Sequence, residues 1–369
     1  MRRGTRAWLR WLHLWAGVLL ALPLAVTGAT GIVLTWEKEL APALNGDAWS
    51  ATPAGEPLSW PALVQELRGH DEGVRIAHLG GERYGDRALL TWLDTPDGFH
   101  AGLVDPYTGE FTRREPGQEL LKTIEALHRN LLLGGIGRQV VAISSLAMVV
   151  VMIIGIVLWW PMRRGTVKGL TRRGALLRWH NLAGLVAAPL LVLFALTGVT
   201  LTYGGTIMPA LYQLASGEPE PARPTIEPAR SASETRAPLP AVFAAARAAV
   251  PDTRVQSFGE PNEPDGVYRL RMRANDSVHP NGWITVYVHP GTAEVVAVRD
   301  PRHASWAAWY DHFWYVLHTG TLLPAVPRAI WAVAAFALPA LCVTGVWHWL
   351  RRRRRGRKRA LRKTVSSGG

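Results

Sequence analysis

Two long apolar stretches of the chain align with each other without a gap, and each begins at a histidine. His13 is followed by Gly17 and Gly31, and His180 is followed at the same spacing by Gly184 and Gly198. A second set of residues also aligns between the halves: His128 with His318, Arg138 with Arg328, Gly155 with Gly345, and Trp159 with Trp349. The sequence therefore predicts two tandem repeats, each with two membrane helices and one histidine at the front of each helix.

Composition agrees with a membrane location. The 369 residues are 48% hydrophobic but carry a net charge of +13, which suits a membrane protein whose basic residues gather on one side. Four stretches reach the ~20 apolar residues that a membrane helix needs. The predicted segments are an N-terminus (1–12), a first span (13–36), an external module (37–139), a second span (140–160), a basic loop (161–179), a third span (180–203), a second external module (204–328), a fourth span (329–350) and a basic tail (351–369).

The basic residues predict the orientation. Arginines precede the first span, arginines and Lys168 fill the loop between the second and third spans, and Arg351 to Arg355 follow the fourth. By the positive-inside rule we expect these three regions, and both termini, to be cytoplasmic. The first span is longer than the ~7–15-residue apolar core of a signal peptide, so we interpret it as an uncleaved anchor. Binding of nucleic acid is not expected, because no aromatic-rich binding module accompanies the basic tail.

The external segments have the pattern of small α+β modules. In the first, 88–93 and 101–111 read as strands around a tight turn, and 60–68 reads as a helix. In the second, 267–272 and 283–295 read as strands, and 240–249 reads as a helix. The fold class that follows is a membrane protein of mixed α and α+β structure. Four transmembrane helices form two tandem two-helix repeats, and each repeat carries one external module.

The paired histidines predict a redox cofactor. His13 and His180 both start outward-running helices, and His128 and His318 both precede inward-running ones, so equivalent histidines should lie at the same membrane face. Cys342 is the single cysteine, which rules out a Cys-x-x-Cys-His haem attachment site or a cysteine-ligated iron–sulfur cluster. We therefore expect two noncovalent haem b groups, one held by His13 with His180 and one by His128 with His318. The alternative is that these histidines are polar anchors at the membrane interface.

Other residues are candidates for contact with the cofactors. Gly17 and Gly184 lie four residues after His13 and His180, on the same helix face, where small side chains leave room for a macrocycle or for close helix packing. Arg138 and Arg328 occupy equivalent places, and their guanidinium groups suit haem propionates and lipid phosphates equally. His312 and His348 have no counterpart in the other half. We interpret them as a surface group and an interface group, with either one a possible replacement ligand.

The residues 104–110, Val-Asp-Pro-Tyr-Thr-Gly-Glu, resemble the Asp-Pro-x-Thr-Gly-Glu hairpin of the PepSY domain. Combined with the duplicated helices, residues 6–352 resemble the PepSY-associated transmembrane family, which includes iron-regulated bacterial inner-membrane proteins and siderophore reductases. The second module departs from this pattern, because His289 replaces the Asp and Ala293 replaces the Gly. We interpret it as a diverged copy whose surface has a separate role.

The resemblance implies a function. It predicts a reductase in the bacterial inner membrane that passes electrons to a periplasmic ferric siderophore and releases Fe(II). The electrons would come from quinol or a cytoplasmic reductase, because the chain has no Gly-x-Gly-x-x-Gly or phosphate-binding loop. Two alternatives stay open: a non-enzymatic PepSY membrane protein that assists or regulates a transporter or protease, and an uptake component that binds haem as cargo.

Overall fold

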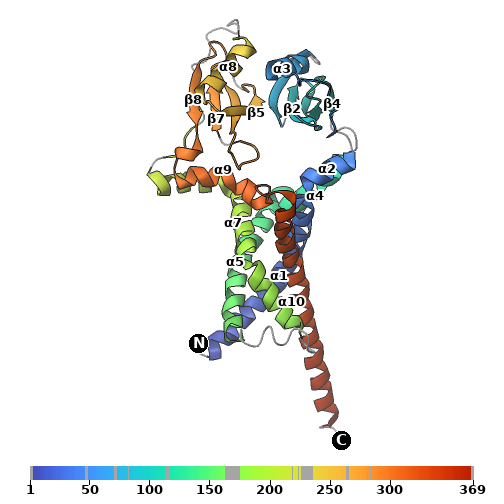
Figure 1. Ribbon diagram of the computed structural model, residues 1–369. Coiled ribbons are helices and arrows are strands. Elements are labelled where there is room, and N and C mark those ends of the chain that lie inside the picture. Colours follow the sequence, from blue (N-terminus) through green and yellow to red (C-terminus); the bar gives the residue numbers. More distant parts are fainter. Residues whose placement is uncertain are drawn as a thin grey trace. The chain divides into compact units, whose positions relative to one another are not determined.

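The computed structural model describes residues 3–45, 49–69, 73–81, 83–113, 117–162, 175–217, 219–222, 224–225, 236–262, 266–282 and 284–366 (Figure 1). The chain forms two compact units. The helical unit comprises Met1–Glu37, Leu121–Gly204 and Trp314–Gly369, and the sheet unit comprises Lys38–Leu120 and Gly205–Phe313. Residues 163–174, which form most of the predicted basic loop, lie outside the described residues. Residues 226–235, in a stretch rich in Pro and Arg, also lie outside them.

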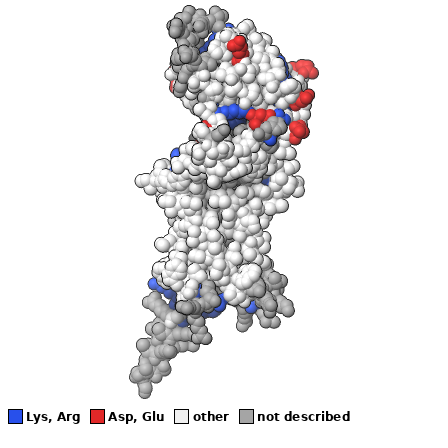
Figure 2. Space-filling model, turned by 90° about the vertical axis from the view of Figure 1, so that its left-hand side faces the viewer, with Lys and Arg blue, Asp and Glu red and all other residues white. Residues whose placement is uncertain are grey.

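Among the described residues, four helices are long and apolar enough to cross a membrane. They are α1 (Arg3–Thr35), α5 (Gly134–Trp159), α7 (Leu176–Ser216) and α10 (Ala325–Ser366). Figure 2 shows a broad belt without charged side chains over this part of the molecule, with Lys and Arg at its lower end. A multi-pass membrane protein of mixed α and β structure is therefore confirmed, whereas the tandem-repeat arrangement stays a prediction.

The four helices pack around a small apolar core. Helix α1 lies against both α5 and α10, and Leu24, Met148, Leu191 and Leu338 are buried between the helices. Gly28 allows α1 to approach α10 closely, because a Cβ atom there would lie 2.7 Å from Cδ of Pro339. The α1–α10 contact therefore depends on the missing side chain at this position.

Two shorter helices carry the histidines that precede the second and fourth spans. Helix α4 (Gly117–Asn130) has His128 in its last turn, and α9 (Trp306–Thr319) has His318 in its last turn. The break after α4 lies at Leu131 and Leu132, whose φ angles are +53° and +60°. Gly134, which begins α5, also has a positive φ of +58°, so the change of chain direction extends from Leu131 to this glycine. After α9, Gly320 adopts a φ of +71°, a conformation that costs glycine little.

The strands of the two segments predicted to be external, 37–139 and 204–328, join in one antiparallel sheet. Its order is β4-β3-β2-β1-β5-β6-β7-β8. The strands are β1 (Arg75–Gly80), β2 (Leu89–Thr95), β3 (Gly98–Val104), β4 (Phe111–Arg113), β5 (Thr253–Gly259), β6 (Tyr268–Ala274), β7 (Ile284–Val288) and β8 (Val295–Arg299). Helices α3 (Trp60–Gly69) and α8 (Leu239–Ala249) share one core with a single face of this sheet. Shorter pieces are α2 (Glu37–Asn45) and two 3₁₀ turns, η2 (Trp160–Met162) and η4 (Pro301–His303).

The seam between the two halves of the sheet is the β1–β5 pair. Leu79 pairs with Phe258 and Gly80 pairs with Ser257. Next to this pair, the buried carboxylate of Glu260 accepts hydrogen bonds from the backbone nitrogen of Ile76 (2.8 Å) and from Nε of Arg68 (2.9 Å). A side chain that follows β5 thus satisfies two donors from α3 and β1, which ties the two halves of the sheet together.

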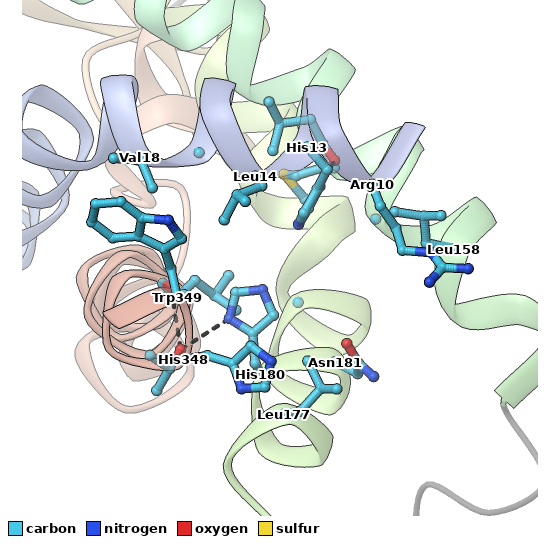
Figure 3. A pocket seen from close by; sticks show the side chains of 18 of the residues that line it. Arg10, His13, Leu14, Val18, Leu158, Leu177, His180, Asn181, His348 and Trp349 are labelled. Carbon is cyan, nitrogen blue, oxygen red and sulfur yellow. Dashed lines mark hydrogen bonds between the residues drawn. The ribbon is translucent and has the colours of Figure 1, made fainter. Parts of the chain in front are cut away.

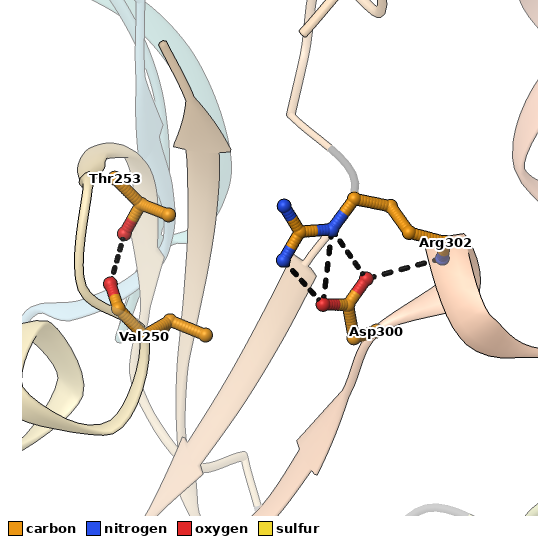
Figure 4. A network of polar contacts seen from close by, with 4 residues as sticks. All are labelled: Val250, Thr253, Asp300 and Arg302. Carbon is orange, nitrogen blue, oxygen red and sulfur yellow. Dashed lines mark hydrogen bonds and ion pairs between the residues drawn. The ribbon is translucent and has the colours of Figure 1, made fainter. Parts of the chain in front are cut away.

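Local polar contacts close the turns of the sheet unit. The Thr253 hydroxyl donates to the Val250 carbonyl (2.7 Å) between α8 and β5, and Asp300 accepts from the Arg302 backbone nitrogen (3.1 Å) at the start of η4 (Figure 4). Both contacts satisfy backbone groups where regular structure ends.

The hairpins at 104–110 and 288–294 make the same turn with different residues. In the first, Oδ1 of Asp105 accepts from the backbone nitrogens of Tyr107 (2.7 Å) and Thr108 (3.2 Å). In the second, Nδ1 of His289 accepts from Gly291 (3.0 Å) and Thr292 (3.1 Å). Ala293 adopts a φ of +56°, where Gly109 has +77°. An imidazole nitrogen therefore replaces a carboxylate oxygen, so the substitutions by themselves do not indicate a separate role.

Candidate functional site

The structure brings the four predicted histidines together as two pairs. The ring centres of His13 and His180 are 6.3 Å apart, with their planes at 88°. The ring centres of His128 and His318 are 6.1 Å apart, with their planes at 67°. Both pairings match the equivalences seen in the sequence.

In the first pair, both Nδ1 atoms are hydrogen-bonded to a neighbouring helix. Nδ1 of His13 donates to the Val151 carbonyl on α5 (3.0 Å). Nδ1 of His180 lies 2.9 Å from the Thr344 hydroxyl on α10. Because the Thr344 hydroxyl donates its own proton to the Ala340 carbonyl (2.7 Å), its oxygen accepts from the imidazole.

The second pair has the same arrangement. Nδ1 of His128 donates to the Thr27 carbonyl (2.9 Å) and lies 3.1 Å from the Thr30 hydroxyl. Nδ1 of His318 lies 2.8 Å from the Thr197 hydroxyl. Both threonine hydroxyls donate to carbonyls of their own helix, at Val26 and Leu193, and therefore accept from the histidines. Throughout the described part of the chain, no Nε2 atom of the four has a hydrogen bond, so each keeps its lone pair for a metal.

A glycine lies against each imidazole. A Cβ atom at Gly155 would lie 3.0 Å from Cε1 of His13, and one at Gly31 would lie 3.1 Å from Cε1 of His128. A Cβ atom at Gly345 would lie 3.5 Å from Cε1 of His180, and one at Gly198 would lie 3.3 Å from Cε1 of His318. These four glycines occupy matched positions in the two halves, and they let a ring pack directly on a helix backbone.

The separation within each pair suits a metal ion held between two imidazoles. Metal–imidazole bonds are about 2 Å long, and a ring nitrogen lies about 1 Å from its ring centre, so two rings on opposite sides of one ion have centres about 6 Å apart. The described residues contain no group of three or more His, Cys, Asp or Glu arranged to hold a metal. Two side-chain ligands suffice only where a cofactor supplies the others, as the haem macrocycle does.

A cavity surrounds the His13–His180 pair. It has a volume of about 940 Å³ and is lined by residues of α1, α5, α7 and α10 (Figure 3). His13 and His180 project into it, and Gly17 and Gly184 form part of its wall. Most of the wall is apolar, including Leu14, Val18 and Leu158. A flat apolar cofactor fits such a lining.

One part of the cavity wall is basic. Arg6, Arg10, Arg352 and Arg353 line it, and the buried Nε of Arg6 has no hydrogen-bond partner among the described residues. A buried donor without a partner indicates a ligand acceptor. The cavity therefore fits a cofactor with an apolar body and carboxylate groups at one edge, as haem has.

The two predicted outer arginines differ from each other. Arg328 is 4% exposed, and its guanidinium group lies 5.1 Å from the centre of the Trp36 ring. Arg138 is exposed on α5. Only Arg328 therefore lies inside the helical unit, and the sequence match between the two does not extend to their environment.

The two additional histidines also differ. His348 lines the cavity beside His180, which keeps it close to the site. His312 is half-buried in the sheet unit, where its Nδ1 donates to the Ala308 carbonyl (2.9 Å) and its own carbonyl accepts from Nε2 of His279 (3.1 Å). His312 was interpreted as a surface group; it is half-buried and held by these two contacts, away from the histidine pairs.

The sequence interpretation missed the groups that orient the imidazoles. These groups are the hydroxyls of Thr30, Thr197 and Thr344 and the carbonyl of Val151. The alignment of Thr30-Gly31 with Thr197-Gly198 was the available signal, because a repeated hydroxyl beside a repeated glycine is a suitable partner for a repeated histidine.

Comparison with models of protein families identifies a family for the chain. The family model of the PepSY-associated TM region matches residues 10–352, nearly the whole chain. No curated protein matches the chain.

Proposed function

The chain belongs to the PepSY-associated transmembrane family, and we propose that it is a haem-dependent reductase that passes electrons across the bacterial inner membrane to a ferric siderophore. The observation that carries the proposal is the presence of two histidine pairs. In each histidine, Nδ1 forms a hydrogen bond and Nε2 forms none among the described residues. When bound, haem would accept and release one electron at a time, which is the chemistry that reduction of Fe(III) to Fe(II) needs.

The protein's own residues hold and orient the cofactors. Nε2 of His13 and His180 would bind one iron, and Nε2 of His128 and His318 would bind the other. The hydrogen bonds from Nδ1 fix the ring orientation and the tautomer of each ligand. Arg6 and Arg10 provide positive charge for propionates at the first site, and the apolar walls of the cavity exclude water.

The orientation proposed here follows from charge. Arg6 and Arg10 near the start of α1, and Arg351 to Arg355 on α10, lie at the same end of the spans as the first histidine pair. By the positive-inside rule this end is cytoplasmic, and the segments that form the sheet, which lie between spans, are periplasmic. Electrons would enter at the His13–His180 site from quinol or a cytoplasmic reductase and leave from the His128–His318 site.

Anaerobic reduction of a ferric siderophore tests this function. Purified protein reduced by quinol should convert the ferric complex to Fe(II), which a ferrous indicator reports. His180→Ala and His318→Ala should each lower the rate by at least about 100-fold, because removal of a ligand breaks one of the two sites.

His289→Asp is the matched control for these variants. It changes a histidine of the sheet unit to the residue that makes the same turn at Asp105, so its rate should equal that of the wild type. Equal rates in all variants would refute the reductase and favour a non-enzymatic membrane protein.

A further inference from the structure

One face of the sheet carries most of its charged residues. On β6, Tyr268, Leu270 and Met272 are fully buried toward α3 and α8, so the alternate residues Arg269, Arg271 and Arg273 lie on the opposite face. That face also carries Arg299, His78 and Trp92, and we call these six residues and their surroundings the arginine face. Asp94 is the one acidic residue within the described strands, and it pairs with Arg75 (2.8 Å).

The centre of the arginine face is built from small residues in register. Gly80 of β1 pairs with Ser257 of β5, Ser257 with Arg271 of β6, Arg271 with Thr285 of β7, and Thr285 with Arg299 of β8. Directly paired residues project from the same side of a sheet. The row therefore begins with two residues of little or no side chain, Gly80 and Ser257. Two arginines with a threonine between them follow.

Aromatic and cationic side chains flank this row. His78 leans over Gly80, where a Cβ atom would lie 2.8 Å from its Nε2, and its ring centre is 4.8 Å from that of Trp92. On the other side, a Cβ at Gly259 would lie 3.5 Å from Nη2 of Arg269. The guanidinium group of Arg299 lies 5.6 Å from the centre of the Tyr287 ring. Planar aromatic rings and guanidinium groups thus stand side by side.

The potential at the arginine face is positive. Burial, together with the charges of Arg269 and Arg271, lowers the pKa of His78 to about 4. Arg271 is exposed and forms no hydrogen bond or ion pair with any residue that the structure describes. The negative charge of Asp311 acts on Arg271, but the Asp311 carboxylate also accepts a hydrogen bond from the Tyr212 hydroxyl (3.3 Å). Arg271 thus presents an exposed guanidinium group beside Arg269, and a cation in this position favours the binding of anions.

We propose that the arginine face binds the iron chelate itself, and that it selects chelates with negatively charged oxygen donors, such as catecholates or carboxylates. Guanidinium forks bind such oxygens through paired hydrogen bonds. Trp92 and the imidazole of His78 offer flat surfaces for aromatic catechol rings. This inference rests on the proposed function, because it names the substrate class of the proposed reductase.

Binding of redox-inert gallium(III) chelates to the purified full chain tests the inference. The trianionic gallium complex of a tris-catecholate should bind at least about tenfold more tightly than the neutral gallium complex of a tris-hydroxamate. Arg271→Gln should weaken binding of the anionic complex by at least about tenfold, because it removes an exposed charge-assisted partner. Arg271→Lys should restore only part of it, since Lys keeps the charge but not the fork.

Arg247→Gln is the matched control, because Arg247 is exposed on α8 and the charge change is the same. It should leave binding unchanged within about twofold, and all variants should unfold at the wild-type temperature. Equal binding of the two complexes, or no effect of Arg271→Gln, would overturn the inference.

The test separates this inference from the proposed function, because gallium(III) cannot be reduced and its binding does not need electron transfer. A protein without haem that binds the anionic complex would refute the reductase and keep the arginine face as a binding site. A haem-containing reductase that prefers the neutral chelate would refute the arginine face alone.

Discussion

The four paired histidines share one hydrogen-bonding pattern that decides which ring nitrogen is available to a metal. In each, Nδ1 donates to a carbonyl or to a threonine oxygen whose own proton is already donated elsewhere. The tautomer is therefore the same at all four positions. The histidines were predictable from the sequence because they recur in matched contexts. Their partners were not, because a carbonyl such as that of Val151 carries no side-chain signal.

At the residue scale, Gly31 should be essential to its histidine. We expect Gly31→Val to displace His128, because even a Cβ atom there would lie 3.1 Å from the ring. Purified Gly31→Val should therefore lose about one haem per chain, as measured by the pyridine haemochrome assay. Gly4→Val makes the same change on the same helix at a place where a Cβ meets nothing within 4 Å, and it should keep the full content. A Gly31→Val protein with wild-type haem would show that close packing on α1 does not position the ligand.

At the element scale, the helices and most strands follow from local patterns, but the joining of the two half-sheets does not. Helix α3 begins at Trp60 and α8 at Leu239, within one residue of the expected starts, because hydrophobic periodicity marks such segments. The pairing of β1 with β5 has no comparable signal, since strands far apart in the chain are matched only by shape and register. The buried carboxylate of Glu260 was equally hidden, because its donors lie about 190 residues away in the sequence.

Replacement of Glu260 should therefore loosen the seam of the sheet. We expect Glu260→Ala to destabilise the sheet unit by about 3 kcal/mol, because it leaves the Ile76 amide and Arg68 without their buried acceptor. Hydrogen exchange of β1 and β5 should show this as exchange that is about 100-fold faster at those strands. Glu110→Ala removes an exposed carboxylate from the first hairpin and should change exchange there by less than about threefold. Unaltered protection of β1 and β5 in Glu260→Ala would mean that the backbone pairing alone holds the seam.

At the scale of the whole molecule, the sequence and the structure agree on four span-capable helices with two histidine pairs between them. They differ in how equivalent residues are used. Arg328 is buried beside Trp36 while Arg138 is exposed, and His348 enters the cavity from one half only. Matched sequence positions thus predict the ligand set well, but they do not predict its surroundings, which depend on residues that differ between the halves.

The central claim is that paired histidines hold two haems. The most direct test is the absorption spectrum of the purified full chain, oxidised and dithionite-reduced, with haem counted per chain. The account predicts close to two low-spin haems, falling to about one in His13→Ala and in His318→Ala, because each variant removes one ligand of a different pair. A colourless protein from haem-supplied cells, or haem content that neither variant changes, would contradict it.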